Sequence, residues 1–417
     1  MKHLHLSFAA KLTVLLLLVT GCGGGDNSAK KKDGKSSKSA GKPTKKSTAG
    51  KKTDKGNSRM LVFIGTYTGE KSKSKGIYTL ELDTSNGELK QVNTPAESEN
   101  PSFLAIHPNK KYLYAVNELE KFQGKENNGA VSAFEIDAAT GSLKLLNQLE
   151  TRGALPCHLV VDKSGKAVLV ANYMGGSVAA YPVLSDGKLG KLSSYYQHQG
   201  SSIKPRQTAP HAHSINIDVN NKIAAVADLG MDAVLLYKFD AEKAWLSDHE
   251  PKSVKVKAGA GPRHFAFHPN GKFAYVINEM NCTITAFAYD GKKGALSELE
   301  TVSTLPKGQE FEDGFSTAEV QVTPSGKFLY GSNRGHNTIV AFKIGDDGKL
   351  TYVENESSGG KMPRNFGIDP TEKYLLAANN NSNDIFVFKI NPNTGALDPT
   401  GKKITIPRPV CVKFLQP

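Results

Sequence analysis

Cysteine and tryptophan are scarce in this sequence, which has four Cys and one Trp among 417 residues. So few cysteines exclude a scaffold stapled by disulfides, and none of them is grouped at the spacing of a zinc site. The Gly-x-Ser-x-Gly elbow that carries the nucleophilic serine of many hydrolases is absent. No apolar run approaches the roughly 20 residues that a membrane-spanning helix needs. A hydrophobic content of 38% in a chain of this length still suffices for a large buried core.

Positive charge is concentrated at the N-terminus. Residues 1–59 contain fourteen Lys or Arg and three Asp, so this segment carries +11 of the net charge of +13 and the rest of the chain is nearly neutral. No aromatic residue lies among the lysines of 23–58 to stack on bases. The sequence therefore predicts no nucleic-acid partner. Binding of nucleic acid by the basic tail is the weaker alternative interpretation of this segment.

The first 22 residues have the pattern of a signal peptide. Lysines and histidines precede the short apolar run Leu12–Val19, which is followed by Thr20-Gly21-Cys22. The stretch Leu18–Cys22 resembles the bacterial lipobox, so we expect lipidation at Cys22; a plain cleaved signal is the alternative. Residues 23–59 are rich in Gly, Ser, Thr and Lys and predict a tether without a core. The expected location is extracytoplasmic, on a membrane of the periplasm or cell surface.

Residues 60–417 consist of one repeated unit. In four copies a Pro opens the unit and an Asn closes it sixteen residues later, as in Pro262 to Asn278. Two further copies keep the spacing from Ala212 and from Thr317. A second segment with alternating apolar residues and a Gly-bearing turn follows each closing residue. Each repeat of about 50 residues thus predicts four short antiparallel strands, the pattern of a propeller blade.

The two ends of this region predict how the propeller closes. Leu61–Thr66 matches the second strand of a repeat and lacks a first strand before it, whereas Pro409–Phe414 matches a first strand. Paired together, they complete one blade and leave no open sheet edge. The predicted fold is all-β: a seven-bladed β-propeller of four-stranded antiparallel blades, closed by its N- and C-terminal strands.

Superposing the repeats places unlike polar residues around one mouth of the central channel. The start of each first strand and the end of each second strand lie on the same face of a propeller, so three columns of the repeat converge there. Polar residues that differ from blade to blade are what an asymmetric ligand site requires. The columns include His158, His213, Arg263, His264, Glu279, Glu319, Arg334, Arg364 and Asn365.

Other regular features of the repeat have structural interpretations. The closing Asn or Asp residues predict side chains bonded to the backbone in turns. His107 and His268, each before a Pro, predict turn residues, and Arg263 with Glu279 could be a plain ion pair. The cysteines at 157, 282 and 411 are expected to be buried or free thiols.

Several motifs carry a resemblance to the seven-bladed lactonase family, which includes propeller-type 6-phosphogluconolactonases and muconate-lactonizing enzymes. They include His211-Ala-His-Ser214, Gly261-Pro-Arg-His-Phe265, Val276-Ile-Asn-Glu279 and Ser332-Asn-Arg-Gly-His336. The resemblance spans residues 60–417 and implies a lactone hydrolase of carbohydrate metabolism. Because the sequence shows no metal-ligand spacing, we expect no metal or cofactor. The resemblance places the family's proposed catalytic groups on His213, Arg263, Glu279 and Arg334.

These residue types suit the opening of a lactone. His213 or Glu279 can take a proton from water, and Arg263 and Arg334 can stabilise developing negative charge or bind an anionic substrate. A Glu paired with Arg has a lowered pKa and is a poor base, which favours His213. His158, His264, Glu319, Arg364 and Asn365 are predicted to orient the substrate. A non-catalytic binding propeller at the cell surface and a muconate-type cycloisomerase remain the alternatives.

Overall fold

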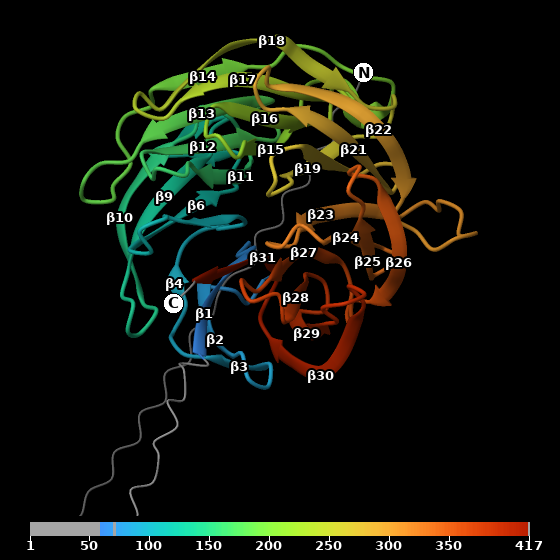
Figure 1. Ribbon diagram of the computed structural model, residues 1–417. Helices are drawn as coiled ribbons and strands as arrows, with labels where there is room; N and C mark the ends of the chain where they lie inside the picture. Colours follow the sequence, from blue (N-terminus) through green and yellow to red (C-terminus); the bar gives the residue numbers. More distant parts are fainter. Residues whose placement is uncertain (1–58, 70–71, 416–417) are drawn as a thin grey trace, which may run out of the picture. The chain divides into compact units, whose positions relative to one another are not determined.

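Antiparallel four-stranded sheets make up the computed structural model, which describes residues 59–69 and 72–415. The signal segment, Cys22 and the tether lie outside the described residues. Figure 1 shows the sheets as blades around a common centre, with short strands inside and longer strands such as β18 and β22 at the rim. The predicted all-β propeller with seven four-stranded blades is confirmed.

Six blades are continuous in the chain, and each has its first strand at the channel and its fourth at the rim. From the channel outward, the bounds are β5 (Leu104–Ile106), β6 (Tyr112–Asn117), β9 (Ala130–Ile136) and β10 (Leu143–Glu150); β11 (Pro156–Val161), β12 (Ala167–Asn172), β13 (Ser177–Pro182) and β14 (Ser194–Gln197); β15 (Ala212–Ile217), β16 (Ile223–Asp228), β17 (Ala233–Asp240) and β18 (Trp245–Lys255); β19 (Pro262–Phe267), β20 (Phe273–Asn278), β21 (Thr283–Asp290) and β22 (Ala295–Ser303); β23 (Ser316–Val322), β24 (Phe328–Arg334), β25 (Thr338–Ile344) and β26 (Leu350–Ser357); β27 (Pro363–Ile368), β28 (Tyr374–Asn379), β29 (Asp384–Ile390) and β30 (Leu397–Thr405).

The seventh blade takes strands from both ends of the described region. Its order from the channel outward is β31 (Pro409–Leu415), β1 (Arg59–Thr66), β2 (Gly76–Asp83) and β3 (Glu88–Gln91), with β4 (Ala96–Glu97) also paired to β2. β1 and β31 are antiparallel, with Val62 opposite Phe414. The innermost strands of all seven blades contact one another in sequence, from β5 round to β31 and back to β5. The predicted closure is confirmed.

Short elements outside the blades are the hairpin of β7 (Lys121–Phe122) with β8 (Lys125–Glu126) and the 3₁₀ turn η1 (Pro205–Gln207). Within residues 59–69 and 72–415, no helix is long and apolar enough to cross a membrane.

Apolar residues of neighbouring blades pack against each other and form the core. One cluster joins Tyr275 and Ile277 of β20 to Leu329 of β24 and Val340 of β25, and all four side chains are fully buried. Full burial of such side chains stabilises the fold by about 1.5–3 kcal/mol each. Tyr275 also donates its hydroxyl hydrogen to the backbone oxygen of Gly348 in the next blade, at 2.9 Å.

Residues predicted to be structural do hold adjacent blades together. A ring nitrogen of His107 lies 2.8 Å from the carbonyl oxygen of Gly165, and His268 makes the same contact with Gly326 at 2.9 Å. The closing Asn172 donates its amide to the backbone oxygen of Thr151 in the preceding connection. These contacts recur from blade to blade, and they confirm turn and linking roles rather than functional ones.

A β-bulge at the start of the inner strands positions the site. In β19, Pro262 pairs with Asn278 but His264 pairs with the next residue, Ile277, so Arg263 is the extra residue. Bulges re-aim side chains and are frequent beside functional sites. The same shift in β11, β15 and β27 leaves the neighbours of their opening residues unpaired: Cys157, His213 and Arg364.

Candidate active site

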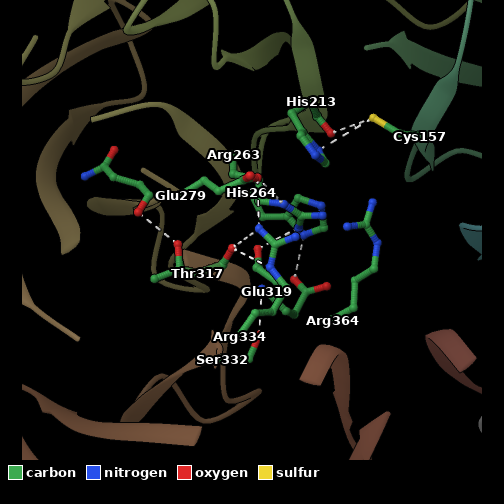
Figure 2. Close-up of polar contacts among 12 residues, drawn as sticks. Cys157, His213, Arg263, His264, Glu279, Thr317, Glu319, Ser332, Arg334 and Arg364 are labelled. Atoms are coloured by element: carbon green, nitrogen blue, oxygen red, sulfur yellow. Dashed lines mark hydrogen bonds and ion pairs between the residues drawn. The ribbon is translucent and has the colours of Figure 1, made fainter. Parts of the chain in front are cut away.

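Two layers of polar side chains result from this bulge. The extra residues His213, Arg263 and Arg364 face the mouth of the channel, and His264 and Asn365, one position later, lie in the layer beneath. Figure 2 shows His213, Arg263, His264, Arg334 and Arg364 converging from several blades. The structure thus brings the predicted residues to one end of the channel, as the repeat columns require.

Glu279 is the centre of the upper layer. Its Oε2 accepts a hydrogen bond from Arg263 Nε at 2.9 Å and lies 3.1 Å from Arg334 Nη2. Its Oε1 accepts from Arg206 Nη2 at 2.5 Å. Glu279 follows the end of β20 directly, and its side chain is 7% exposed. Three guanidinium groups therefore share one buried carboxylate.

Electrostatics keep this carboxylate charged. Burial alone would raise the pKa of Glu279, but the guanidinium groups of Arg334, Arg263 and Arg206 together outweigh burial and hold the pKa well below its usual range. A carboxylate with so low a pKa is a weak base. Glu279 is therefore suited to orienting arginines rather than to accepting a proton.

Two of the arginines are fixed independently of Glu279. Arg263 Nη1 donates to the backbone oxygen of Ala318 at 2.8 Å. Arg334 donates from both Nε and Nη2 to the backbone oxygen of Thr317, at 3.1 and 2.6 Å. Both side chains are almost fully buried. These bonds hold both guanidinium groups in place before a substrate binds, which is a condition for stabilising charge that develops during a reaction.

His213 is a neutral imidazole beside this cluster. Burial and the nearby Arg263 and His264 lower its pKa well below 6.5. Its Nδ1 lies 3.6 Å from Cys157 Sγ, and its ring centre lies 5.4 Å from that of His264. Among the described residues, no hydrogen-bond partner occupies Nε2. The unoccupied Nε2 of a neutral ring can accept a hydrogen bond from water at neutral pH.

The Cys157 thiol next to His213 does not form a nucleophilic pair with it. The thiol donates to the backbone oxygen of His213, at 3.3 Å. Burial raises the pKa of Cys157, so the thiol stays protonated, whereas the reactive species is the thiolate. Cys157, Cys282 and Cys411 are buried and free, which confirms the prediction for these residues.

Arg364 lies across the mouth from Glu279. Its Nη2 donates to the Tyr67 hydroxyl at 2.8 Å, and that hydroxyl donates to the Glu118 carboxylate at 2.9 Å. The guanidinium carbon also lies 5.4 Å from the centre of the Tyr67 ring. Together with Arg206, Arg263 and Arg334, it makes four guanidinium groups against the carboxylates of Glu118 and Glu279. The mouth is therefore electropositive.

The lower layer contains the remaining predicted residues. His264 Nδ1 lies 3.1 Å from Glu319 Oε1, and Glu319 Oε2 accepts a short hydrogen bond from Asn365. His158 packs against His264 with ring centres 5.3 Å apart. Burial raises the pKa of Glu319, and the nearby Lys413 offsets this only in part.

This layer separates the mouth from the channel below. Phe103, His158, His264 and Glu319 line a cavity of about 410 Å³ that continues along the inner strands to Phe267 and Phe414. On the other side, Phe103 and His264 also line a pocket of about 10 Å³ with Arg263 and Arg364. The lower layer is therefore the floor of the site at the mouth.

Arg206 is the member of the site that the repeat did not reveal. It lies in η1, within the connection 198–211 between β14 and β15, outside the aligned columns. This connection is longer than the corresponding connections 151–155 and 256–261, and its length was the only signal in the sequence that pointed to Arg206.

Within the described residues, no three His, Cys, Asp or Glu side chains are grouped so as to hold a metal ion.

Comparisons with known proteins agree with this architecture. A family model described as lactonase, 7-bladed beta-propeller, matches residues 61–414. A 6-phosphogluconolactonase of Bacillus subtilis is 36% identical over 86% of this chain and 99% of its own length. One from Formosa agariphila is 37% identical over 83% of this chain and 96% of its own.

A solved structure gives the same result. The periplasmic gluconolactonase of Pseudomonas aeruginosa superposes with a TM-score of 0.79 at 32% identity, covering 86% of this chain and 99% of that one. The expectation of a lactonase-type enzyme is confirmed by the family description and by the names of these relatives. This protein belongs to the family of seven-bladed β-propeller lactonases.

Proposed function

We propose that this protein hydrolyses a sugar lactone in the manner of 6-phosphogluconolactonases, by general acid–base catalysis that uses protein side chains alone. The observation that carries the proposal is the cluster at the mouth: Glu279 gathers three arginines beside neutral His213. The family membership supplies the reaction class. Each predicted catalytic residue then has a separate task.

His213 is the proposed general base. Its free Nε2 takes a proton from water as the water oxygen attacks the lactone carbonyl carbon. Arg263 and Arg334 stabilise the negative charge that develops on the carbonyl oxygen, and Glu279 keeps both guanidinium groups aligned. The imidazolium then returns the proton to the ring oxygen as the carbon–oxygen bond breaks, which releases the hydroxy acid.

The substrate is oriented by the two layers. Arg364 faces the mouth and suits a substrate phosphate or carboxylate, which it can bind with two parallel hydrogen bonds. His158, His264, Glu319 and Asn365 form the floor against which the sugar ring rests. Because Arg binds phosphate and carboxylate alike, both are proposed as substrate groups.

The proposed location is outside the cytoplasm, with a lipid anchor at Cys22. The lipobox-like Leu18–Cys22 and the core-free 23–59 segment support this proposal. The structural relative from Pseudomonas aeruginosa is itself described as periplasmic. An extracytoplasmic enzyme requires a lactone that occurs there, so a carboxylate-bearing or neutral sugar lactone fits the anchor better than a cytoplasmic sugar phosphate.

A lactone panel tests this function. We expect full-length protein in detergent to open at least one sugar lactone faster than the spontaneous reaction. His213→Ala should lose turnover by about 10²–10⁴-fold, the range for a general base. His249→Ala is the matched control, since it also truncates a buried histidine but lies on β18 at the rim. Equal turnover in wild type and His213→Ala would refute the proposal.

A further inference from the structure

Arg206 is attached to the site differently from the other arginines. Among the described residues it makes a single side-chain hydrogen bond, to Glu279 Oε1. Its side chain is 47% exposed, whereas that of Arg263 is 3% exposed. A guanidinium has five N–H donors, so most of those on Arg206 point to solvent. It is the arginine of the cluster that is free to take another partner.

The two oxygens of Glu279 are also used differently. Oε2 binds the fixed Arg263 and Arg334, whereas Oε1 binds Arg206. Departure of Arg206 would therefore leave the fixed pair in place and uncover Oε1 toward the mouth. A change at Arg206 need not disturb the rest of the cluster.

The backbone that carries Arg206 is anchored by Asp232. Asp232 Oδ1 accepts from Gln207 Nε2 at 2.8 Å, and Oδ2 accepts from Ser202 Oγ at 2.5 Å. The same carboxylate accepts the backbone N–H groups of Gly259 and Gly261, just before β19. The loop is thus tied to the strand that bears Arg263, while the Arg206 side chain is not tied to it. Its guanidinium can change partner without unfolding the loop.

We propose that Arg206 determines specificity by exchanging partners, from Glu279 Oε1 in the empty site to the anionic group of a bound lactone. This proposal rests on the proposed function. The exchange supplies a charge-assisted bond to an anionic substrate and uncovers Oε1 for a substrate hydroxyl. A neutral lactone has no acceptor that competes with the Glu279 carboxylate for Arg206. Arg206 therefore stays on Oε1 when a neutral lactone binds.

The test compares matched lactones in full-length protein. 6-Phosphoglucono-δ-lactone carries a phosphate, D-glucaro-1,4-lactone a carboxylate and glucono-δ-lactone neither. A lost charge-assisted hydrogen bond of about 1.5–3 kcal/mol corresponds to roughly 10–150-fold. We expect Arg206→Ala to raise KM by that factor for whichever anionic lactone the enzyme prefers, and to lower the ratio of kcat/KM for that lactone to kcat/KM for the neutral lactone by a similar factor.

Lys204→Ala is the matched control, because it removes a positive charge from the same loop without touching Glu279. This variant should change kcat/KM for each of the three lactones by less than about twofold, which corresponds to well under 1 kcal/mol. Arg206→Lys should restore part of the anion preference. Equal losses on neutral and anionic lactones would show that Arg206 only supports Glu279, and no change would show that it has no role; either result overturns the proposal.

Calorimetry with the product acids separates this proposal from the proposed function. If wild type opens no lactone, it should still bind 6-phosphogluconate or glucarate more tightly than gluconate, and Arg206→Ala should remove that difference. Turnover of neutral lactone, without tighter binding of the two acids that carry a second anionic group, would leave the hydrolase assignment intact and refute the role of Arg206.

Discussion

Arg263 Nε donates to Glu279 Oε2 across 2.9 Å, joining the bulged residue of β19 to the residue that follows β20. Both residues lie at the same end of one blade, and neither occupies a regular paired position. Because of the bulge, Arg263 and Glu279 form their ion pair at the channel mouth instead of on the face of the sheet. The chemistry of the site therefore depends on a local irregularity that the repeat places in several blades.

Cys157 tests whether the thiol beside His213 takes part in catalysis. Because the buried thiol stays protonated and donates to a backbone oxygen, Cys157→Ala should keep most of the wild-type kcat/KM. His213→Ala measured in parallel should lose at least about 100-fold. A loss in Cys157→Ala as large as that in His213→Ala would point to a thiolate nucleophile.

The pH dependence of turnover tests the state of His213. Its pKa lies well below 6.5, so the ring is already neutral at pH 6 and can act as a base there. We expect kcat/KM to stay nearly flat from about pH 8 down to about pH 6, in contrast to the midpoint near 6.5 of an unperturbed histidine. The profile is measured by titrating the acid released from a lactone that is stable to spontaneous opening. A midpoint at 6.5 would contradict the assignment.

Glu279 should make stability depend on acid. Its folded-state pKa is depressed, so its contribution is complete above about pH 5 and is lost as pH falls below the unfolded-state value of about 4.3. Glu279→Gln should lower the free energy of unfolding at pH 7 by about 3 kcal/mol, since it leaves buried guanidinium groups uncompensated. The difference from wild type should shrink toward pH 3 in urea titrations. Glu135→Gln, at an exposed position on β9, is the control and should show neither effect.

Glu319 should change the free energy of unfolding with pH in the direction opposite to Glu279. Burial raises its pKa, so the folded state favours the protonated acid and loses stability as pH rises through the folded-state pKa. Glu319→Gln mimics the neutral acid and should gain stability relative to wild type between pH 4.5 and pH 8. Urea unfolding at these two values provides the measurement. A constant difference at both values would mean that Glu319 is ionised throughout.

The sequence predicted the architecture because the repeat itself encodes it. The constant spacing from Pro262 to Asn278, and its copies, set strand register in the six continuous blades, and the half-blades at Leu61 and Pro409 determined the closure. Column positions placed His213, Arg263 and Arg334 at one mouth for the same reason. Such positions follow from counting residues, which needs no knowledge of side-chain contacts.

Other parts of the site depend on geometry that counting does not supply. Arg206 reaches Glu279 from a loop outside the repeat, and only the length of that loop marked it. The division into two layers arises because a bulge separates Arg263 from His264, which a column alignment treats as simple neighbours. The charge of Glu279 depends on the guanidinium groups around it, and the neutrality of His213 depends on its burial first and on Arg263 and His264 next.

The shared blade of β1 and β31 has a consequence for how the molecule is made. β1 is the first propeller strand to leave the ribosome, whereas β31, its partner on the channel side, is the last propeller strand to do so. The ring therefore stays open throughout synthesis, and its first sheet cannot be finished until every other blade exists. A chain exported before folding would therefore meet no barrier from a ring that had already closed. Once the ring has closed, a pull on the segment before Arg59 would be resisted by the hydrogen bonds between β1 and β31.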